Sequence, residues 1–493
     1  MLLAQSRHET ALGKEWMRVK ISQLHLSDFM LFQQADFQWS PGINVICGTN
    51  STGKTALIKL MYSLHKSYEQ WNSTETKEAA VSKFSEKLCG VFRPDNGKVG
   101  RLVRRKQGNA QMTASMGYEN GTSIDVNFGN RASKIATLIL PKMEHTASPD
   151  HTAVYFPPKE IISATENFTS LYEEYHIAFE ETYYDLAKLL DRPLKRGKNS
   201  DEQNQVLASL DEILHGTTVQ HDKKFYLNAE NGGEFEMGLV SEGYRKLATI
   251  TYLIRNGCLN ANSVLFWDEP ETNMNPGMIR PLVDAMMQLA KLKVQIFITT
   301  HDYFLRQYLN MYMAFPESNT DQIDIRFFSL FFEDGAIKAE MADTISELQH
   351  NSIMEEFDAI YNREQGFIYD RIRECLIFNN LSASVVRFSI TSITTRTNSS
   401  RNSPAPAAVS LFTYPINSSC TTSSALPQII SILRTHSICS FSFISSSTPS
   451  TSAISRTSTA TRSSHSFCTD SSSAGSSSAQ VSLTYSCGCF SCK

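Results

Sequence analysis

The segment INVICGTNSTGKT, residues 43–55, joins an apolar run to the pattern G-x-x-x-x-G-K-[ST]. The run from Ile43 to Cys47 is typical of a buried strand. The apolar residues that follow the pattern fall on one helical face: Leu57, Leu60, Met61 and Leu64. The pattern therefore lies between a buried strand and the N-terminus of a helix, which predicts an α/β fold around this turn.

A turn of this kind binds phosphates through its backbone. Its glycines let successive N–H groups surround phosphate oxygens, and the helix dipole adds positive potential. Lys54 would reach the β- and γ-phosphates of a nucleotide, and Thr55 would bind Mg²⁺. We therefore expect ATP and Mg²⁺ as cofactors. The predicted nucleotide-binding residues are Gly48, Asn50, Ser51, Thr52, Gly53, Lys54 and Thr55. The alternative, a chance glycine-rich turn, leaves its position between strand and helix unexplained.

A second apolar run, Ser263 to Trp267, ends in two adjacent acids, Asp268 and Glu269. Paired carboxylates at the end of a buried strand raise each other's pKa and cost stability unless a cation compensates. Asp268 would orient Mg²⁺, and Glu269 would accept the proton of the attacking water. The alternative interpretation is a pair of helix N-cap residues that faces solvent.

A third apolar run, Val294 to Thr300, is followed directly by His301 and Asp302. If this strand joins the other two in a parallel sheet, His301 lies on the same edge and can reach a γ-phosphate and its neighbouring water. A histidine in an ordinary loop is the alternative for His301 taken alone.

Four motifs in this order resemble an ABC-type ATPase head of the RecF/SMC-like and OLD-like AAA-family ATPases of prokaryotes, over roughly residues 17 to 345. They are residues 48–55, 241–246 (SEGYRK), 268–276 (DEPETNMNP) and 299–302 (TTHD). The resemblance implies a P-loop NTPase fold with a mixed N-terminal sheet and a parallel core sheet. It also implies that Ser241 and Gly243 contact the γ-phosphate bound by another protomer. His301 would be the switch histidine, and the stretch after Pro270 the D-loop.

Two departures narrow the resemblance. Glu242 replaces the second glycine of the transporter signature, as in the OLD-like branch. The strand expected to end in a Q-loop glutamine reads AVYFPPK, residues 153–159, without one. Coupling to a membrane channel is therefore not expected.

The organisation expected from composition and pattern has five parts. Residues 1–16 precede a second methionine and are interpreted as a start extension; 17–157 hold the N-terminal half of the head. Residues 158–230 form a helical lobe, with one helical stretch over 171–190, and 231–375 form the C-terminal half. Lys20 to Phe37 predicts two strands around a turn at Ser27 to Phe29, and residues 325–341 predict a hairpin before a C-terminal helix.

Residues 376–493 differ in composition from the rest. They are dominated by serine and carry one acid, Asp470, against seven basic residues. Such a composition cannot bury enough apolar area to offset chain entropy, so we expect disorder. It also resembles translation in a shifted reading frame. The terminal CGCFSC, residues 487–492, suggests a metal site, but serine-rich sequence supplies no folded surroundings for one.

Composition limits the functions open to the chain. A formal net charge of −4 argues against a surface built for nonspecific nucleic-acid binding. The basic cluster Arg101, Arg104, Arg105 and Lys106 is better explained as a solvated strand edge than as a phosphate contact. No long apolar run occurs, so we expect a cytoplasmic protein without membrane contact.

These observations predict an ATPase with Glu269, His301 and Lys54 as catalytic residues and with Thr55 and Asp268 at the metal. It would act as an ATP-sandwiched homodimer or higher oligomer that regulates a separate effector, such as a nuclease, in an antiphage or toxin-like system. Two alternatives stay open: a RecF-like ATPase that binds DNA in repair or replication, and a nucleotide-gated scaffold with little turnover.

Overall fold

The computed structural model of the chain describes residues 20–141, 152–175, 177–378, 385–390, 412–415 and 441–445. The chain divides into two compact units, Met1–Glu355 and Glu356–Lys493, and each is described by itself. Every predicted site residue lies in the first unit. The predicted start extension, residues 1–16, lies outside the described residues.

Six strands form the core sheet of the first unit, in the order β14-β13-β3-β12-β11-β7. Their bounds are β3 Ile43–Gly48, β7 Ala153–Phe156, β11 Val264–Asp268, β12 Gln295–Thr299, β13 Ile325–Glu333 and β14 Ala336–Ala342. Neighbouring strands are parallel except β14, which pairs antiparallel with β13. The carboxyl ends of β3, β12 and β11 therefore meet at one edge, where parallel sheets place their ligand sites.

A second sheet holds five strands in the order β2-β1-β4-β5-β6. Their bounds are β1 Ile21–Phe29, β2 Phe32–Gln38, β4 Gln111–Tyr118, β5 Ser123–Gly129 and β6 Thr137–Ile139. Its described pairs are all antiparallel, whereas the resemblance implied a mixed sheet. The first hairpin turns after Phe29 rather than at Ser27 to Phe29, because Phe29 is fully buried and pairs with Phe32.

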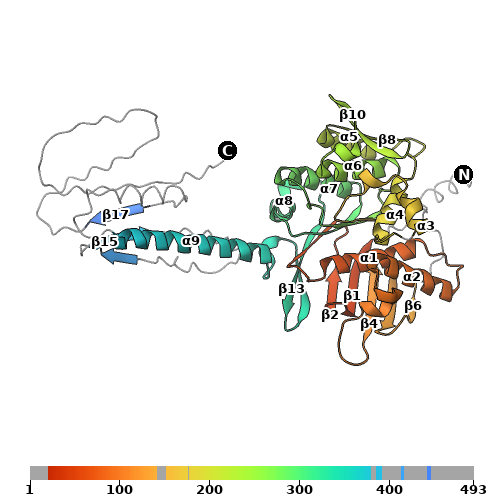
Figure 1. The fold of residues 1–493 in the computed structure, drawn as a ribbon, viewed down its shortest axis with the longest axis horizontal. Helices are drawn as coiled ribbons and strands as arrows, with labels where there is room; N and C mark the ends of the chain where they lie inside the picture. Colours follow the sequence, from red (N-terminus) through yellow and green to blue (C-terminus); the bar gives the residue numbers. More distant parts are fainter. Residues whose placement is uncertain are drawn as a thin grey trace, which may run out of the picture. The chain divides into compact units, whose positions relative to one another are not determined.

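The P-loop helix, α1 (Lys54–Glu69), is buried around most of its circumference. Its predicted apolar face is fully buried, and so are Ile58 and Tyr62 on other sides of the helix. A helix that is apolar on several sides is buried between layers. Figure 1 shows α1 and α2 (Lys77–Phe92) against the antiparallel sheet, and their side chains share one core with both sheets.

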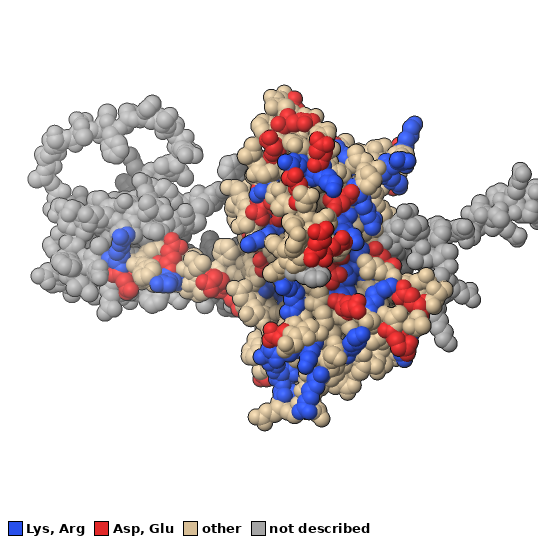
Figure 2. All heavy atoms as spheres, turned by 45° about the vertical axis from the view of Figure 1, so that its right-hand side comes forward, with Lys and Arg blue, Asp and Glu red and all other residues tan. Residues whose placement is uncertain are grey.

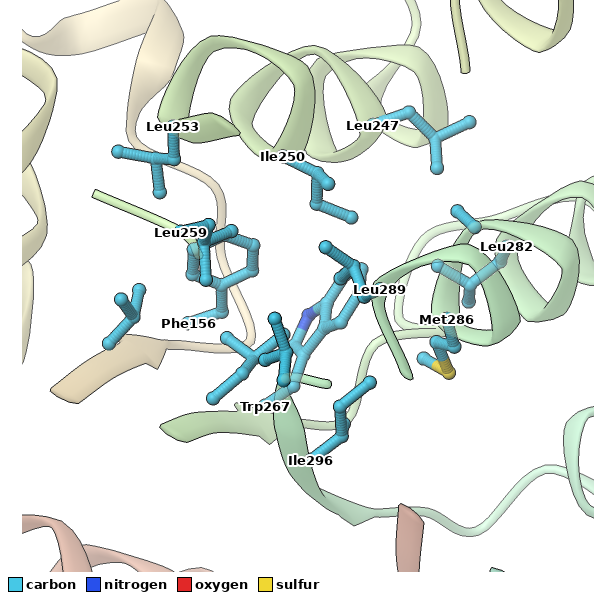
Figure 3. Packing of buried hydrophobic residues seen from close by; sticks show 14 of the residues in the cluster. Phe156, Leu247, Ile250, Leu253, Leu259, Trp267, Leu282, Met286, Leu289 and Ile296 are labelled. Carbon is cyan, nitrogen blue, oxygen red and sulfur yellow. The ribbon is translucent and has the colours of Figure 1, made fainter. Parts of the chain in front are cut away.

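The other face of the core sheet packs against α6 (Glu242–Arg255) and α7 (Ile279–Lys291). Trp267 of β11 is the largest fully buried side chain among the described residues, and its ring meets that of Phe156 edge to face at 5.2 Å. Figure 3 shows Trp267 beneath Ile250 of α6 and beside Leu289 of α7. Burial on both faces explains why β11 reads as a continuous apolar run rather than an alternating one.

The predicted helical lobe contains more than helices. It holds α3 (Phe168–Tyr175), α4 (Glu181–Leu190) and α5 (Asp201–Leu214), so the single helical stretch expected over 171–190 is two helices. It continues into a small antiparallel sheet of β8 (Gly216–His221), β9 (Lys224–Ala229) and β10 (Gly233–Glu236), in the order β10-β9-β8. The sequence analysis did not predict this sheet. Its outer strand, β10, is exposed at every residue and so carries no alternating apolar pattern.

The end of the first unit follows the predicted order. Strands β13 and β14 form the expected hairpin, and Asp334 and Gly335 take left-handed φ values of 49° and 75°, as a two-residue hairpin turn requires. Helix α8 (Tyr303–Ala314) begins two residues after His301, and α9 (Ser352–Phe378) starts in the first unit. Short 3-10 helices are η1 Asp95–Gly97, η2 Val99–Leu102, η3 Ile162–Ala164, η4 Met237–Leu239, η5 Pro276–Met278, η6 Pro316–Ser318 and η7 Ile345–Glu347.

In the second unit, the structure describes most of α9 and three short antiparallel strands. These are β15 (Val385–Ile390), β16 (Phe412–Pro415) and β17 (Phe441–Ser445), in the order β16-β15-β17. The remaining residues of 376–493, among them CGCFSC at 487–492, lie outside the described residues, so disorder there stays a prediction. Among the helices that the structure describes, none is both long and apolar enough to cross a bilayer.

Candidate functional site

The turn between β3 and α1 depends on two glycines. Gly48 and Gly53 have φ values of 145° and 88°, in the left-handed region that favours glycine. A Cβ on Gly48 would lie 2.3 Å from the carbonyl oxygen of Leu330, and one on Gly53 would lie 2.8 Å from the Phe32 ring. Neighbouring elements therefore leave no room for a side chain at either end of the turn. Between them, Thr49, Asn50 and Ser51 are exposed.

Lys54 lies folded back over this turn. Its Nζ donates hydrogen bonds to the carbonyl oxygens of Gly48, at 2.8 Å, and Thr49, at 2.9 Å. Burial lowers the pKa of the Lys54 ammonium to about 8, and the nearby Glu269 and Asp268 carboxylates offset part of this shift. The carbonyl oxygens and the nearby carboxylates compensate this buried ammonium only in part, so an anion in the turn would stabilise its charge.

Asp268 lies at the end of β11 and is almost fully buried. Its Oδ1 accepts hydrogen bonds from the hydroxyls of Thr55, at 2.9 Å, and Thr299, at 2.5 Å, and the Tyr155 hydroxyl donates to Oδ2 at 3.2 Å. Burial raises the pKa of Asp268, and the bonds from the two threonines oppose that shift. Asp268 therefore joins the ends of β11 and β12 to the first turn of α1.

Glu269 follows in a left-handed conformation, with φ at 47°. Its N–H lies 3.1 Å from both the carbonyl and the hydroxyl oxygen of Thr299, which fixes this turn to the end of β12. The turn directs the Glu269 side chain to a half-exposed position, with Oε1 3.6 Å from Nε2 of His301. Burial, together with the charge of Lys54, lowers the pKa of His301, which favours a neutral imidazole at neutral pH.

The structure thus brings together Lys54, Thr55, Asp268, Glu269 and His301, as the sequence predicted from the parallel order of their strands. The pair of acids does not form a solvent-facing helix N-cap, since Asp268 is buried at a strand end. Among the described residues, no cluster of three or more His, Cys, Asp or Glu could hold a metal ion. Thr55 and Asp268 supply hard oxygens only, which suits Mg²⁺ that takes its other ligands from phosphate and water.

Ser241 and Gly243 belong to a different part of the unit. Ser241 is the exposed N-cap residue of α6, and Gly243 lies against Met274 and Met278 of the loop after β11. Among the described residues, no hydrogen bond joins Ser241 to the turn at residues 48–55. No direct bond therefore links this signature to the phosphate-binding turn within the part of the chain that the structure describes.

The loop after β11 has partners that the sequence analysis did not predict. Lys246 of α6 is buried and donates to the carbonyl oxygens of Pro270, at 3.0 Å, and Thr272, at 2.7 Å. Glu242, the residue that departs from the transporter signature, accepts a hydrogen bond from Asn273 at 3.1 Å. The replacement for glycine thus secures the same loop. In the sequence, the signal for this contact was the position of Lys246 on the apolar face of α6.

Glu271 was part of the quoted acidic motif but received no role of its own. Its Oε1 accepts hydrogen bonds from the Thr300 hydroxyl, at 2.7 Å, and from the His301 N–H, at 3.0 Å. Burial raises the pKa of Glu271. This carboxylate is thus hydrogen-bonded to the main chain of the predicted switch histidine.

Comparison with known proteins gives a consistent result. A family model described as "AAA domain, putative AbiEii toxin, Type IV TA system" matches residues 131–306. The RecF DNA replication and repair proteins of Streptococcus equi subsp. zooepidemicus and Limosilactobacillus reuteri are 28% identical over 99 residues and 35% identical over 77 residues. These matches cover 18% and 14% of this chain, and 27% and 21% of the relatives, so the chain spans only about a quarter of their length.

Solved structures with similar chains include two heads. One is the SMC head domain from Thermotoga maritima, with a TM-score of 0.36 and 10% identity over 66% of this chain and 99% of that one. The other is the recombination mediator protein RecF-ATPrS, with a TM-score of 0.32 and 13% identity over 65% and 98%. The sheet order, the four motifs, the family model and the RecF relatives make the first unit similar to an ABC-type ATPase head of the RecF/SMC-like class.

Proposed function

We propose that the chain binds and hydrolyses ATP with Mg²⁺. The observation that carries the proposal is the group at one sheet edge: Asp268, hydrogen-bonded to Thr55, stands beside Glu269 and His301, in front of the buried ammonium of Lys54. These are the groups that phosphoryl transfer needs, namely a cation for the phosphates, oxygens for a metal and a base for water.

Each residue has a separate task in this proposal. Backbone N–H groups of residues 48–53 and the Lys54 ammonium hold the phosphates, since both present positive charge to the same turn. Thr55 and Asp268 hold Mg²⁺, which when bound neutralises charge that develops on the phosphate oxygens. Glu269 accepts the proton of the attacking water. The lowered pKa of His301 keeps its imidazole neutral. A neutral ring can form hydrogen bonds without forming an ion pair with the Glu269 carboxylate.

A second copy of the chain would complete the site. Ser241 is exposed and, among the described residues, has no hydrogen bond to its own phosphate-binding turn, so a second chain would supply the signature contact. In a head-to-tail dimer, each signature faces the nucleotide of the partner. ATP would then lie in the dimer interface. Its hydrolysis would control dimer opening, because contacts between the signature and the nucleotide of the partner would be lost.

The test uses Glu269→Gln, which preserves the side-chain shape but removes the proton acceptor. We expect normal ATP affinity, loss of phosphate release and a dimer in the presence of MgATP, measured by light scattering after size exclusion. Exposed Glu236→Gln on β10 serves as the matched control. Phosphate release by Glu269→Gln at the parent rate would assign the base to another residue. Tight ATP binding by the parent without phosphate release would instead support the nucleotide-gated scaffold.

We further propose that this ATPase regulates a separate effector, such as a nuclease, in an OLD-like antiphage or toxin-like system. The support is the DEPE form of the acidic motif and the family description, which names a toxin–antitoxin system. The test is co-purification of the products of neighbouring genes with the parent and with Glu269→Gln in MgATP. Retention of a nuclease only by the ATP-bound form supports regulation, and equal absence from both samples contradicts it.

The second candidate is a RecF-like DNA-binding ATPase, which the RecF relatives favour. Figure 2 shows Lys and Arg gathered at the lower end of the head, although acids are interspersed over the rest of that face. Three members of the basic cluster have contacts within the chain: Arg101 with Asp95, Lys106 with Asp28 and Arg104 with the Gly335 carbonyl. Duplex DNA that accelerates phosphate release, with loss of that effect in Arg105→Glu, would select this candidate.

A further inference from the structure

We propose that Glu271 is a positioning residue for hydrolysis, which fixes the main chain at His301 so that the imidazole faces Glu269. This inference rests on the proposed ATPase function. It adds a residue that touches neither the phosphates nor the attacking water and acts through the histidine.

The geometry begins at the turn between β12 and α8. The Thr300 hydroxyl accepts the N–H of Asp302 at 2.9 Å and donates to Oε1 of Glu271 at 2.7 Å. The same Oε1 accepts the N–H of His301 at 3.0 Å. A single carboxylate oxygen thus binds the first two residues of the turn Thr300-His301-Asp302, and the Thr300 hydroxyl links it to the third. Asp302 then caps α8 by accepting the N–H of Leu305 at 2.6 Å.

The Glu271 carboxylate is held at a cost. Its Oε2 is buried and has no hydrogen-bond partner among the residues that the structure describes. Desolvating a carboxylate is unfavourable, and each buried oxygen without a donor adds to the penalty. The donors from Thr300 and His301 satisfy only Oε1, so the acceptor at this turn is kept at an electrostatic cost. Such arrangements are commonly found at functional sites.

The consequence falls on the imidazole rather than on the nucleotide. His301 is about one third exposed, and its Nε2 lies 3.6 Å from Glu269 Oε1. The main chain that Glu271 holds sets the direction of the Cα–Cβ bond of His301, and with it the positions that the ring can reach. Displacing a catalytic group by about 1 Å can cost about 100-fold in rate. Within the described residues, no hydrogen bond joins Glu271 to Lys54 or to the turn at residues 48–53, so ATP affinity should be kept.

The experiment compares Glu271→Ala with Glu271→Gln in the full chain. Alanine removes the acceptor, whereas glutamine retains an oxygen for Thr300 and His301. We expect alanine to lower kcat by about 10- to 100-fold with little change in KM for ATP, and glutamine to restore most of the rate. Exposed Glu317→Ala serves as the matched control. Equal damage from alanine and glutamine would overturn the proposal.

A second readout does not depend on turnover. The imidazole cross-peak of His301, assigned from a His301→Asn spectrum, should move in nucleotide-free Glu271→Ala and stay near its parent position in Glu271→Gln. An unmoved cross-peak in the alanine variant overturns the positioning role even if the parent hydrolyses ATP. If the cross-peak moves in Glu271→Ala but the parent releases no phosphate, the positioning role is supported and the proposed function is contradicted. If Glu271→Ala melts too low to assay, Glu271→Met provides similar volume without an acceptor.

Discussion

The hydroxyl of Thr55 donates a hydrogen bond to Oδ1 of Asp268 across 213 positions of sequence, at 2.9 Å. Thr55 lies in the first turn of α1 and Asp268 at the end of β11, with β12 between β11 and β3 in the sheet. The side chain of Thr299 at the end of β12 completes the link. The two residues that we assign to the metal are therefore adjacent.

Asp268→Asn should weaken the use of Mg²⁺ more than the binding of ATP itself. The amide keeps the shape but loses the negative charge that a divalent cation requires. We expect the Mg²⁺ concentration for half-maximal phosphate release to rise at least tenfold, roughly the effect of losing one hydrogen bond to a charged group. Asp284→Asn on α7 is the control. An unchanged Mg²⁺ requirement would remove Asp268 from the metal site.

Lys54→Ala should weaken ATP binding by about 10- to 150-fold, because hydrogen bonds to charged groups contribute about 1.5–3 kcal/mol. The backbone N–H groups of the turn would retain the remaining affinity. Calorimetric titration of the variant and of the exposed control Lys338→Ala measures the difference, and a melting curve checks that the buried position tolerates alanine. Affinity equal to that of the parent would show that the nucleotide binds elsewhere.

ATP affinity should decrease as the pH rises above about 8. Burial lowers the pKa of Lys54 from 10.5 to about 8. The phosphates bind the protonated form, so above pH 8 the protein must take up a proton as ATP binds, and affinity falls by up to about tenfold per pH unit. For stability the sign is opposite: the cost of the buried charge is largest below pH 8 and disappears between pH 8 and 10.5.

The control for this pH dependence is Lys54→Arg. A guanidinium stays protonated throughout this range, so its ATP affinity should lack the decrease above pH 8. Calorimetry in two buffers with different ionisation enthalpies would detect the proton uptake in the parent directly. A parent affinity that is constant from pH 7 to 9.5 would contradict the lowered pKa.

Much of the site was predictable because its signals are local. Residues 43–57 contain the strand, the glycines and the helix face in one continuous pattern, and the strands before Asp268 and His301 are short apolar runs. Parallel order then places their ends together. Glu271 and Lys246 could not be assigned in this way. Their partners lie 24 to 30 residues away and include main-chain atoms, which have no sequence signature.

The fold shows the same limit. The hairpin at β13 and β14 was predictable from Asp334-Gly335, because that dipeptide favours the left-handed φ values it adopts. The turn after β1 was predicted too early, since Asp28 resembles a turn residue and indeed has a φ of 49°, yet the strand continues to Phe29. Burial of Phe29 in the core between the sheets decides the outcome, and this is a long-range effect that the sequence pattern does not contain.

Removing residues 379–493 should leave ATP binding and turnover unchanged. The cut keeps α9 whole, since this helix ends at Phe378, and every assigned site residue lies in the unit Met1–Glu355. The serine-rich composition of the removed part is a poor source of core residues, so the melting temperature should change by only a few degrees. Melting curves and phosphate release for the shortened and full chains provide the measurement.

Solubility should rise in the shortened chain, because the removed segment carries apolar stretches such as Ile429-Ile430-Ser431-Ile432-Leu433 and six cysteines that can link chains. Light scattering under reducing and oxidising conditions separates these two causes of association. A large fall in melting temperature or in phosphate release would show that residues after 378 stabilise the head. That result would contradict the interpretation of this segment as a product of a shifted reading frame, because unselected sequence has no reason to stabilise a folded partner.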